Sequence, residues 1–178
     1  YIDSDSFIDF FILNEISRNV DAYRISTFMH KDKGDKLKMG PIWDFNIAFG
    51  NANYCEGYKA TGWRYKFNSV CPGDIWQIPF WWDRLMESEY FKNRLKNRWD
   101  ELRQVKLSNI TINNIIDSHV KFLSNNNVIN ENFINWPIIG KWIWPNSFIG
   151  NTHEEEITYL KEWVGKRLNW LDQHMGFL

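Results

Sequence analysis

The sequence predicts an α+β fold that is mostly α-helical, with a small β-hairpin near its beginning and a helical bundle after it. Apolar residues recur at helical spacing in one segment before residue 20 and in several segments after residue 78. Only the stretch between residues 25 and 43 combines extended apolar runs with a glycine-containing turn, the pattern of a hairpin. A chain of 178 residues can bury a sizeable core, so we expect a single domain over residues 1–178.

The first predicted helix covers residues 3–18. Ser4 or Asp5 can cap its N-terminus, because a short polar side chain there accepts a hydrogen bond from a free backbone N–H. The apolar residues of this helix form a broad face, made of Phe7, Phe10, Phe11, Leu13 and Ile16. We interpret the polar Asn14 and Glu15 as surface residues.

A β-hairpin is predicted next, from strands at residues 25–30 and 36–43 that the charged turn KDKGD connects. Asp21 lies shortly before this hairpin, and Asp44 directly follows it. A twisted hairpin brings its two ends together. We therefore expect the two carboxylates within about 10 Å of each other, close enough to share a metal–phosphate site.

The segment GPIWDFNIAFGN, residues 40–51, allows two interpretations. Its alternating aromatic and polar residues are typical of a strand, which would turn Asp44 and Asn46 toward solvent. However, Asp and Asn are poor strand residues, and the Gly-Pro before the run and the Gly-Asn after it indicate turns. The second interpretation is a ligand loop, in which a carboxylate and an amide oxygen bind a hard cation such as Mg²⁺.

Residues 51–79 contain several Gly and Pro residues and little periodicity, so we expect a long ordered loop, a kind of segment that is often functional. Cys55 and Cys71 lie within it, 16 positions apart. A disulfide between them would stabilise the fold by about 3 kcal/mol in the chain-entropy model. The alternative is two unrelated thiols in a reducing compartment. We favour the disulfide, and with it an extracytoplasmic protein.

Helices dominate the remaining chain. The last predicted helix begins after Thr152, a capping residue, and carries three acidic residues at the positive end of its dipole. The five predicted helices cover residues 79–86, 89–107, 108–124, 131–139 and 152–175.

Composition and motifs exclude several classes of function. With 21 basic and 22 acidic residues, the chain has no general electrostatic basis for binding nucleic acid or an anionic membrane. No apolar run reaches the roughly 18 residues of a membrane span. His-x-x-x-His, Gly-x-Ser-x-Gly and glycine-rich phosphate loops are all absent from the sequence. These absences argue against a zinc hydrolase, an α/β-hydrolase and a nucleotide-binding glycine loop.

Three segments together resemble a known family. They are FFILNEISRNVDAYR (10–24), GDKLKMGPIWDFN (34–46) and IAFGN (47–51). The order of helix, Asp-bearing loop, hairpin and Asp-Phe resembles the C-terminal lobe of protein kinases. The closer resemblance is to the CotH kinase family, atypical protein kinases first known from the bacterial spore coat. It covers roughly the first third of the chain.

The resemblance implies a role for each matching residue. Asp21 would be the catalytic aspartate that orients a substrate hydroxyl, and Asp44 would bind Mg²⁺ on the phosphates of ATP. Asn46 stands where many relatives carry a second Asp, and Ser26 stands where the kinase pattern has Asn. Both departures weaken the implied metal site. Arg24 could pair with Asp21 or meet a phosphate directly.

The resemblance also implies partners and a missing part. The substrate would be a protein with a Ser or Thr acceptor. The family's N-terminal lobe, with its phosphate-binding Lys, would precede Tyr1. We therefore do not expect these 178 residues alone to catalyse phosphate transfer. The competing hypothesis is a degenerate, Trp-rich module that binds a glycan or a protein at the bacterial cell surface or after secretion. The intact Asp21 and Asp44 favour the enzyme, whereas Asn46, Ser26 and the eleven Trp residues favour the module.

Overall fold

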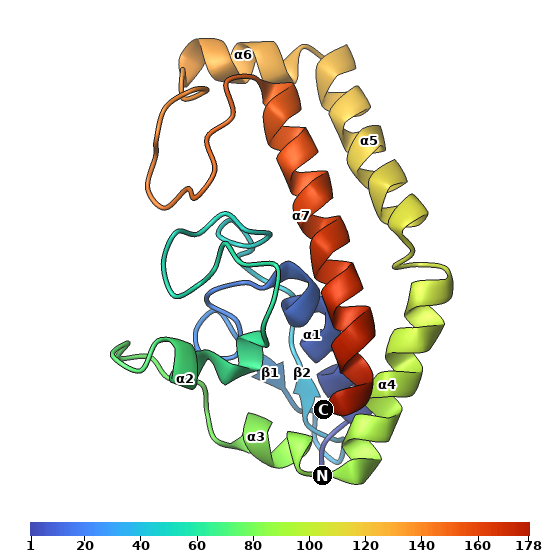
Figure 1. Cartoon of the computed structure of the whole chain (residues 1–178). Helices are drawn as coiled ribbons and strands as arrows, with labels where there is room; N and C mark the ends of the chain where they lie inside the picture. Colours follow the sequence, from blue (N-terminus) through green and yellow to red (C-terminus); the bar gives the residue numbers. More distant parts are fainter.

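The computed structural model describes every residue from Tyr1 to Leu178, and it confirms a mostly helical α+β fold (Figure 1). The helices and strands are α1 (Ser4–Ser17), β1 (Met29–His30), β2 (Lys38–Met39), α2 (Phe67–Val70), α3 (Trp81–Met86), α4 (Glu89–Gln104), α5 (Asn109–Asn125), α6 (Val128–Asn135) and α7 (His153–His174). The 3₁₀ helices η1 (Arg64–Lys66) and η2 (Met175–Phe177) precede α2 and follow α7. None of these helices combines the length and the apolar character that a membrane span requires.

Helix α1 is the central element, and it packs against α4, α7 and β2. Its N-cap is Asp3 and not the predicted Ser4 or Asp5, because the Asp3 carboxylate accepts the Ser6 N–H at 3.1 Å. The interpretation of Asn14 and Glu15 as surface residues is wrong, since both are buried. Neighbouring elements cover α1 on more than one side, so its polar residues must find partners inside the protein.

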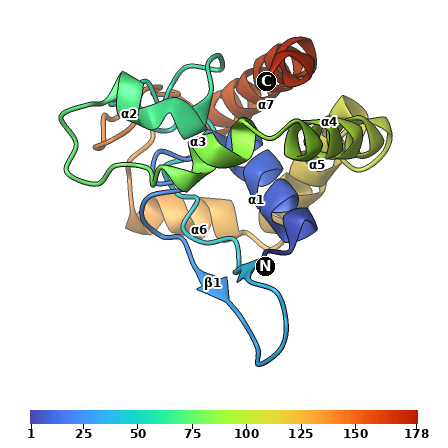
Figure 2. The same cartoon turned by 90° about the horizontal axis from the view of Figure 1, so that it is seen from below.

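The hairpin is much shorter than the predicted strands at residues 25–30 and 36–43. Its ladder pairs Met29 with Met39 and His30 with Lys38. Figure 2 shows that it projects from the helical body. Both residues of β1 are exposed, so little packing supports a longer ladder.

The helices after residue 80 match the predictions with small shifts. Ser108 and Thr152 cap α5 and α7 as expected, each accepting a backbone N–H from three residues on. Helix α6 runs over Val128–Asn135 and not over 131–139, because Pro137 disfavours a helical conformation at the residue before it. Helices α4 and α5 follow one another along one side of α7, and α6 crosses beyond their ends (Figure 1).

One hydrophobic core of 25 buried residues holds these elements together. Trp82 of α3 belongs to this core and is fully buried. Its ring stacks on Phe10 with centroids 5.9 Å apart, and it meets Tyr23 edge-on at 4.7 Å. Phe10 belongs to α1 and Tyr23 to the loop after it, so this cluster fixes the loop that carries Asp21.

Candidate functional site

Asn19 joins the two aspartate-bearing loops. Its amide oxygen accepts the Asp21 N–H at 3.2 Å, and its amide nitrogen donates to the Asp44 carbonyl at 3.2 Å. Asn19 itself is buried. The side chain therefore holds the loop before the hairpin against the loop after it, where the sequence predicts a shared site.

The environment of Asp21 raises the pKa of its carboxyl group. Burial is the largest cause, because it penalises the charged form, and the nearby charge of Asp44 raises the pKa further. The Arg24 guanidinium, 3.1 Å from Asp21 Oδ1, opposes both effects. Asp21 Oδ2 has no hydrogen-bond partner within the protein, so it is free to accept one from a ligand.

Arg24 pairs with Asp21, which is the first of the two roles expected for it. Its guanidinium also donates to Asp74 at 3.1 Å and to the carbonyl oxygens of Val20 and Trp76. It lies 4.3 Å from the ring centroid of Phe67, and only 3 % of the side chain is exposed. With these partners Arg24 orients Asp21 and has little capacity left for a phosphate.

Asp44 lies on a loop, so the strand interpretation of residues 40–51 is wrong: no strand covers any of them. Its φ of 61° is left-handed, as is that of Ser26, whose hydroxyl donates to Asp44 Oδ2 at 3.2 Å. Asp44 and Asn46 are both exposed, and the Asn46 side chain has no hydrogen-bond partner in the protein. Left-handed non-glycine residues are costly, and they gather at functional sites.

A buried ionic network lies behind the site, and the sequence reasoning missed it. Glu15 of α1 is fully buried and pairs with Arg167 of α7 at 2.9 Å. It also accepts hydrogen bonds from the Tyr23 hydroxyl at 3.0 Å and from the N–H groups of Arg64 and Tyr65, each at 2.8 Å. Burial lowers the pKa of Arg167 to about 10, and the Glu15 carboxylate works against that shift. No sequence signal pairs residues 152 positions apart.

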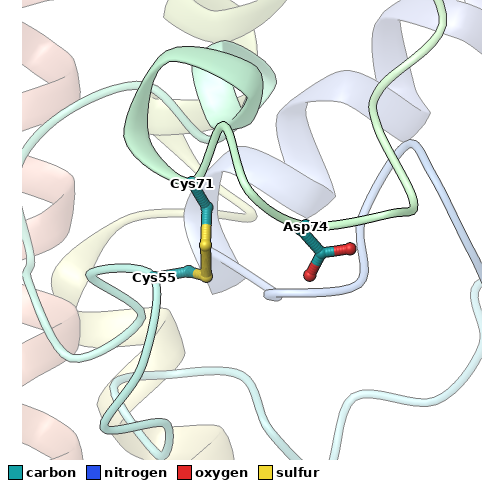
Figure 3. A group of neighbouring side chains, drawn as sticks. All are labelled: Cys55, Cys71 and Asp74. Carbon is teal, nitrogen blue, oxygen red and sulfur yellow. A yellow bond between two sulfur atoms is a disulfide. The ribbon is translucent and has the colours of Figure 1, made fainter.

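The predicted disulfide between Cys55 and Cys71 is confirmed, with Cα atoms 5.4 Å apart (Figure 3). Asp74 lies close by, and the ligand atoms of the three residues lie within 4.8 Å of one another. The two sulfur atoms are bonded to each other, so in this state they are not thiolate ligands for a metal. The disulfide instead fixes Cys71, which directly follows α2 and lies three residues before Asp74, the residue that Arg24 binds.

Reducing the disulfide should lower stability and loosen this side of the site. In the chain-entropy model a closed loop of this length contributes about 3 kcal/mol to the free energy of unfolding. We expect the Cys55→Ser/Cys71→Ser double variant to unfold at a clearly lower urea concentration than the oxidised protein. A reductant should shift the wild type in the same way and leave the variant unchanged. A reductant that leaves the wild-type midpoint in place would contradict this prediction.

The fold and the site together define a class of mostly helical domain in which two loops each carry an aspartate. Asn19 joins the two loops, and their carboxylates are oxygen ligands of the kind that a cation binds. A family model described as CotH kinase protein matches residues 1–171, and the chain belongs to the CotH kinase family. The match extends well beyond the first third of the chain, so the helices after residue 80 are part of the family's domain as well. Comparisons with curated proteins and with solved structures return no match.

Proposed function

We propose that this chain forms the C-terminal lobe of a CotH-like Ser/Thr protein kinase, which transfers the γ-phosphate of ATP to a protein hydroxyl with Mg²⁺. The observation that carries the proposal is the joining of the Asp21 and Asp44 loops through Asn19 in a member of this family. The disulfide supports an extracytoplasmic location, on the bacterial cell surface or after secretion.

The donor set on the loop after the hairpin suits Mg²⁺, which prefers oxygen ligands. Asp44 Oδ1 and the Asn46 amide oxygen have no partners within the protein, and both residues are exposed. Bound there, the ion would neutralise charge on the ATP phosphates. With a single carboxylate on this loop, most of the remaining ligands must come from phosphate and water.

Asp21 is suited to take the proton of the acceptor hydroxyl. Its free Oδ2 accepts the hydrogen bond, while Arg24 holds Oδ1 and fixes the orientation of the carboxylate. As the hydroxyl oxygen bonds to the γ-phosphorus, its proton passes to Asp21 and the bond from phosphorus to the bridging oxygen of ADP breaks. The carboxylate must be ionised at the start of this step.

Replacing Asp21 by asparagine tests the proposal in the full-length protein. We expect phosphate transfer from labelled ATP to fall by about 10²–10⁴, the usual contribution of general base catalysis, while nucleotide binding is retained. Asp32→Asn is the matched control, because Asp32 lies exposed in the hairpin turn. Transfer by Asp21→Asn at the wild-type rate would refute the role of this residue.

The pH dependence of transfer should also report on Asp21. An ionised base is needed, so activity should fall as the pH drops through the pKa of Asp21. Burial and Asp44 raise that pKa, so we expect the acidic limb above the ordinary aspartate value of about 3.9. The measurement is kcat/KM against pH for the wild type. An acidic limb at or below the ordinary value would contradict the assignment.

The second candidate is a binding module for a glycan or a protein, and one observation favours it. The segment after α6 exposes Trp136, Trp142 and Trp144 by 67 %, 56 % and 65 %. Exposed tryptophans are typical of binding surfaces. Under this hypothesis the folded, metal-supplied wild type would show no phosphate transfer, and Asp21→Asn would bind its partner normally.

A further inference from the structure

A pocket of about 460 Å³ opens beside the Asp44 loop. Three parts of the chain form it: the segment around residues 45–51, the segment from residue 133 to residue 148, and the first half of α7. Figure 1 shows that the long loop after α6 lies beside α7 and extends toward the loop that follows β2. Ten of its sixteen lining residues are hydrophobic, among them Phe45, Phe49, Ile138, Phe148, Ile157 and Leu160, so its interior suits an apolar group.

The walls of this pocket are fixed without a ligand. The Gly50 carbonyl accepts hydrogen bonds from the Ser147 hydroxyl at 2.6 Å and from the Tyr159 hydroxyl at 3.3 Å. Phe148 stacks on Tyr159 with ring centroids 4.2 Å apart and an interplanar angle of 2°. A side chain at Gly50 would place its Cβ 2.5 Å from Nε1 of Trp163, so only glycine allows this close packing. A preformed pocket binds without a large ordering cost.

The polar residues of the pocket favour a ligand in which an anionic group lies next to the apolar group. Lys141 and His153 line it, and neither forms an ion pair in the protein. Glu156 is the acidic residue of the lining, and its carboxylate already accepts the Gly150 N–H at 2.6 Å. The Glu156 carboxylate also lies in the first turn of α7, where the positive end of the helix dipole offsets part of its charge. The Lys141 ammonium has no such partner in the protein, so a carboxylate on the ligand complements it.

The position of the pocket connects it to the transfer site. Phe45 and Asn46 line it and directly follow Asp44 in the chain. An extended polypeptide advances roughly 3.3 Å per residue. A peptide whose hydroxyl lies at Asp21 could therefore place a side chain in the pocket a few residues away.

We infer that this pocket selects the acceptor polypeptide by binding an apolar side chain that is flanked by an acidic residue. The inference rests on the proposed function, because it assigns the substrate of that same site. The aliphatic lining from Ile138, Ile157 and Leu160 favours a peptide side chain over a sugar, whose hydroxyl groups would lose their hydrogen bonds there.

Labelled peptides with one central Ser test the inference on the full-length protein. Leu or Gly is placed two to five residues from the Ser, and Glu or Lys is placed next to it. Fluorescence anisotropy without ATP measures binding. We expect Leu-Glu peptides to bind roughly tenfold or more tighter than Gly-Glu peptides, because the leucine is buried in the complex. Leu-Glu peptides should also bind tighter than Leu-Lys peptides.

Charge reversal identifies the pocket as the binding site. Lys141→Glu should reverse the preference between Leu-Glu and Leu-Lys, whereas Lys121→Glu, on the exposed face of α5, should leave it unchanged. Equal affinity for all peptides, or an unaltered preference in Lys141→Glu, would overturn the inference. Binding of cellohexaose or chitohexaose in the pocket, without peptide binding, would overturn it as well.

The same peptides separate this inference from the proposed function. Selective binding without phosphate transfer from labelled ATP would refute the kinase and leave a peptide site. Transfer that ignores the flanking residues would refute the pocket and leave the kinase.

Discussion

Replacing Asp44 by asparagine is expected to abolish Mg²⁺-dependent phosphate transfer and to leave the fold intact. Asp44 is the only carboxylate on the proposed metal loop, so the variant loses the single anionic protein ligand there. Metal stabilisation of developing charge contributes several kcal/mol to a transfer reaction, so activity should fall by more than about 100-fold. The measurement is transfer from labelled ATP over a range of Mg²⁺ concentrations.

Asparagine is the informative substitution at this position. The backbone of Asp44 is left-handed, a conformation that asparagine tolerates better than alanine does. Its amide oxygen can still accept the Ser26 hydroxyl that now donates to Asp44. Circular dichroism should therefore match the wild type, and the Asp32→Asn control should keep full activity. Undiminished transfer by a folded Asp44→Asn variant would refute the site assignment.

The elements that the sequence predicted correctly are those with a local cause. The apolar periodicity and the caps of α5 and α7 involve residues three or four positions apart, so they can be read without the fold. The hairpin was overestimated because an apolar run predicts a strand regardless of what covers it. In the structure β1 is exposed, and the ladder ends after two pairs.

The residues of the candidate site also differ in whether a local sequence pattern predicts them. The sequence predicts Asp21 and Asp44 as candidates because each lies at one end of the hairpin pattern. Asn19 could have been found too, since asparagine side chains commonly bind the backbone two residues on. Asp74 could not, because its contact with Arg24 spans 50 positions and depends on the fold that brings the segment after Cys71 to Arg24.

The buried pair of Glu15 and Arg167 in the core has no local sequence signal either, because the two residues are 152 positions apart. Breaking this pair is expected to have the largest effect on stability. Replacing Glu15 by glutamine should lower the free energy of unfolding by about 3–5 kcal/mol, because one partner of a buried ion pair is removed while the other stays charged. Arg167 is fully buried, and at neutral pH it would carry an uncompensated charge. The new amide N–H₂ would also face donors, namely the Tyr23 hydroxyl or the N–H groups of η1. Urea unfolding followed by tryptophan fluorescence measures the loss.

Three further variants separate the ionic pair from general damage to the core. Glu87→Gln, in an exposed pair with Arg84, should leave the midpoint unchanged. Arg167→Met leaves the Glu15 carboxylate without its ion-pair partner and removes the hydrogen bonds that the guanidinium donates to the carbonyl oxygens of Glu15, Ala60 and Gly62, so this variant should lose about as much stability as Glu15→Gln. The double variant Glu15→Gln/Arg167→Met should lose less than the sum of the two single losses, because neither charge is then left alone. A loss below about 1 kcal/mol for Glu15→Gln, the usual value for a surface pair, would mean that this network does not hold α1 against α7. The loop that carries Asp21 would then depend on the aromatic packing around Trp82 and on the hydrogen bonds of Asn19 and Arg24.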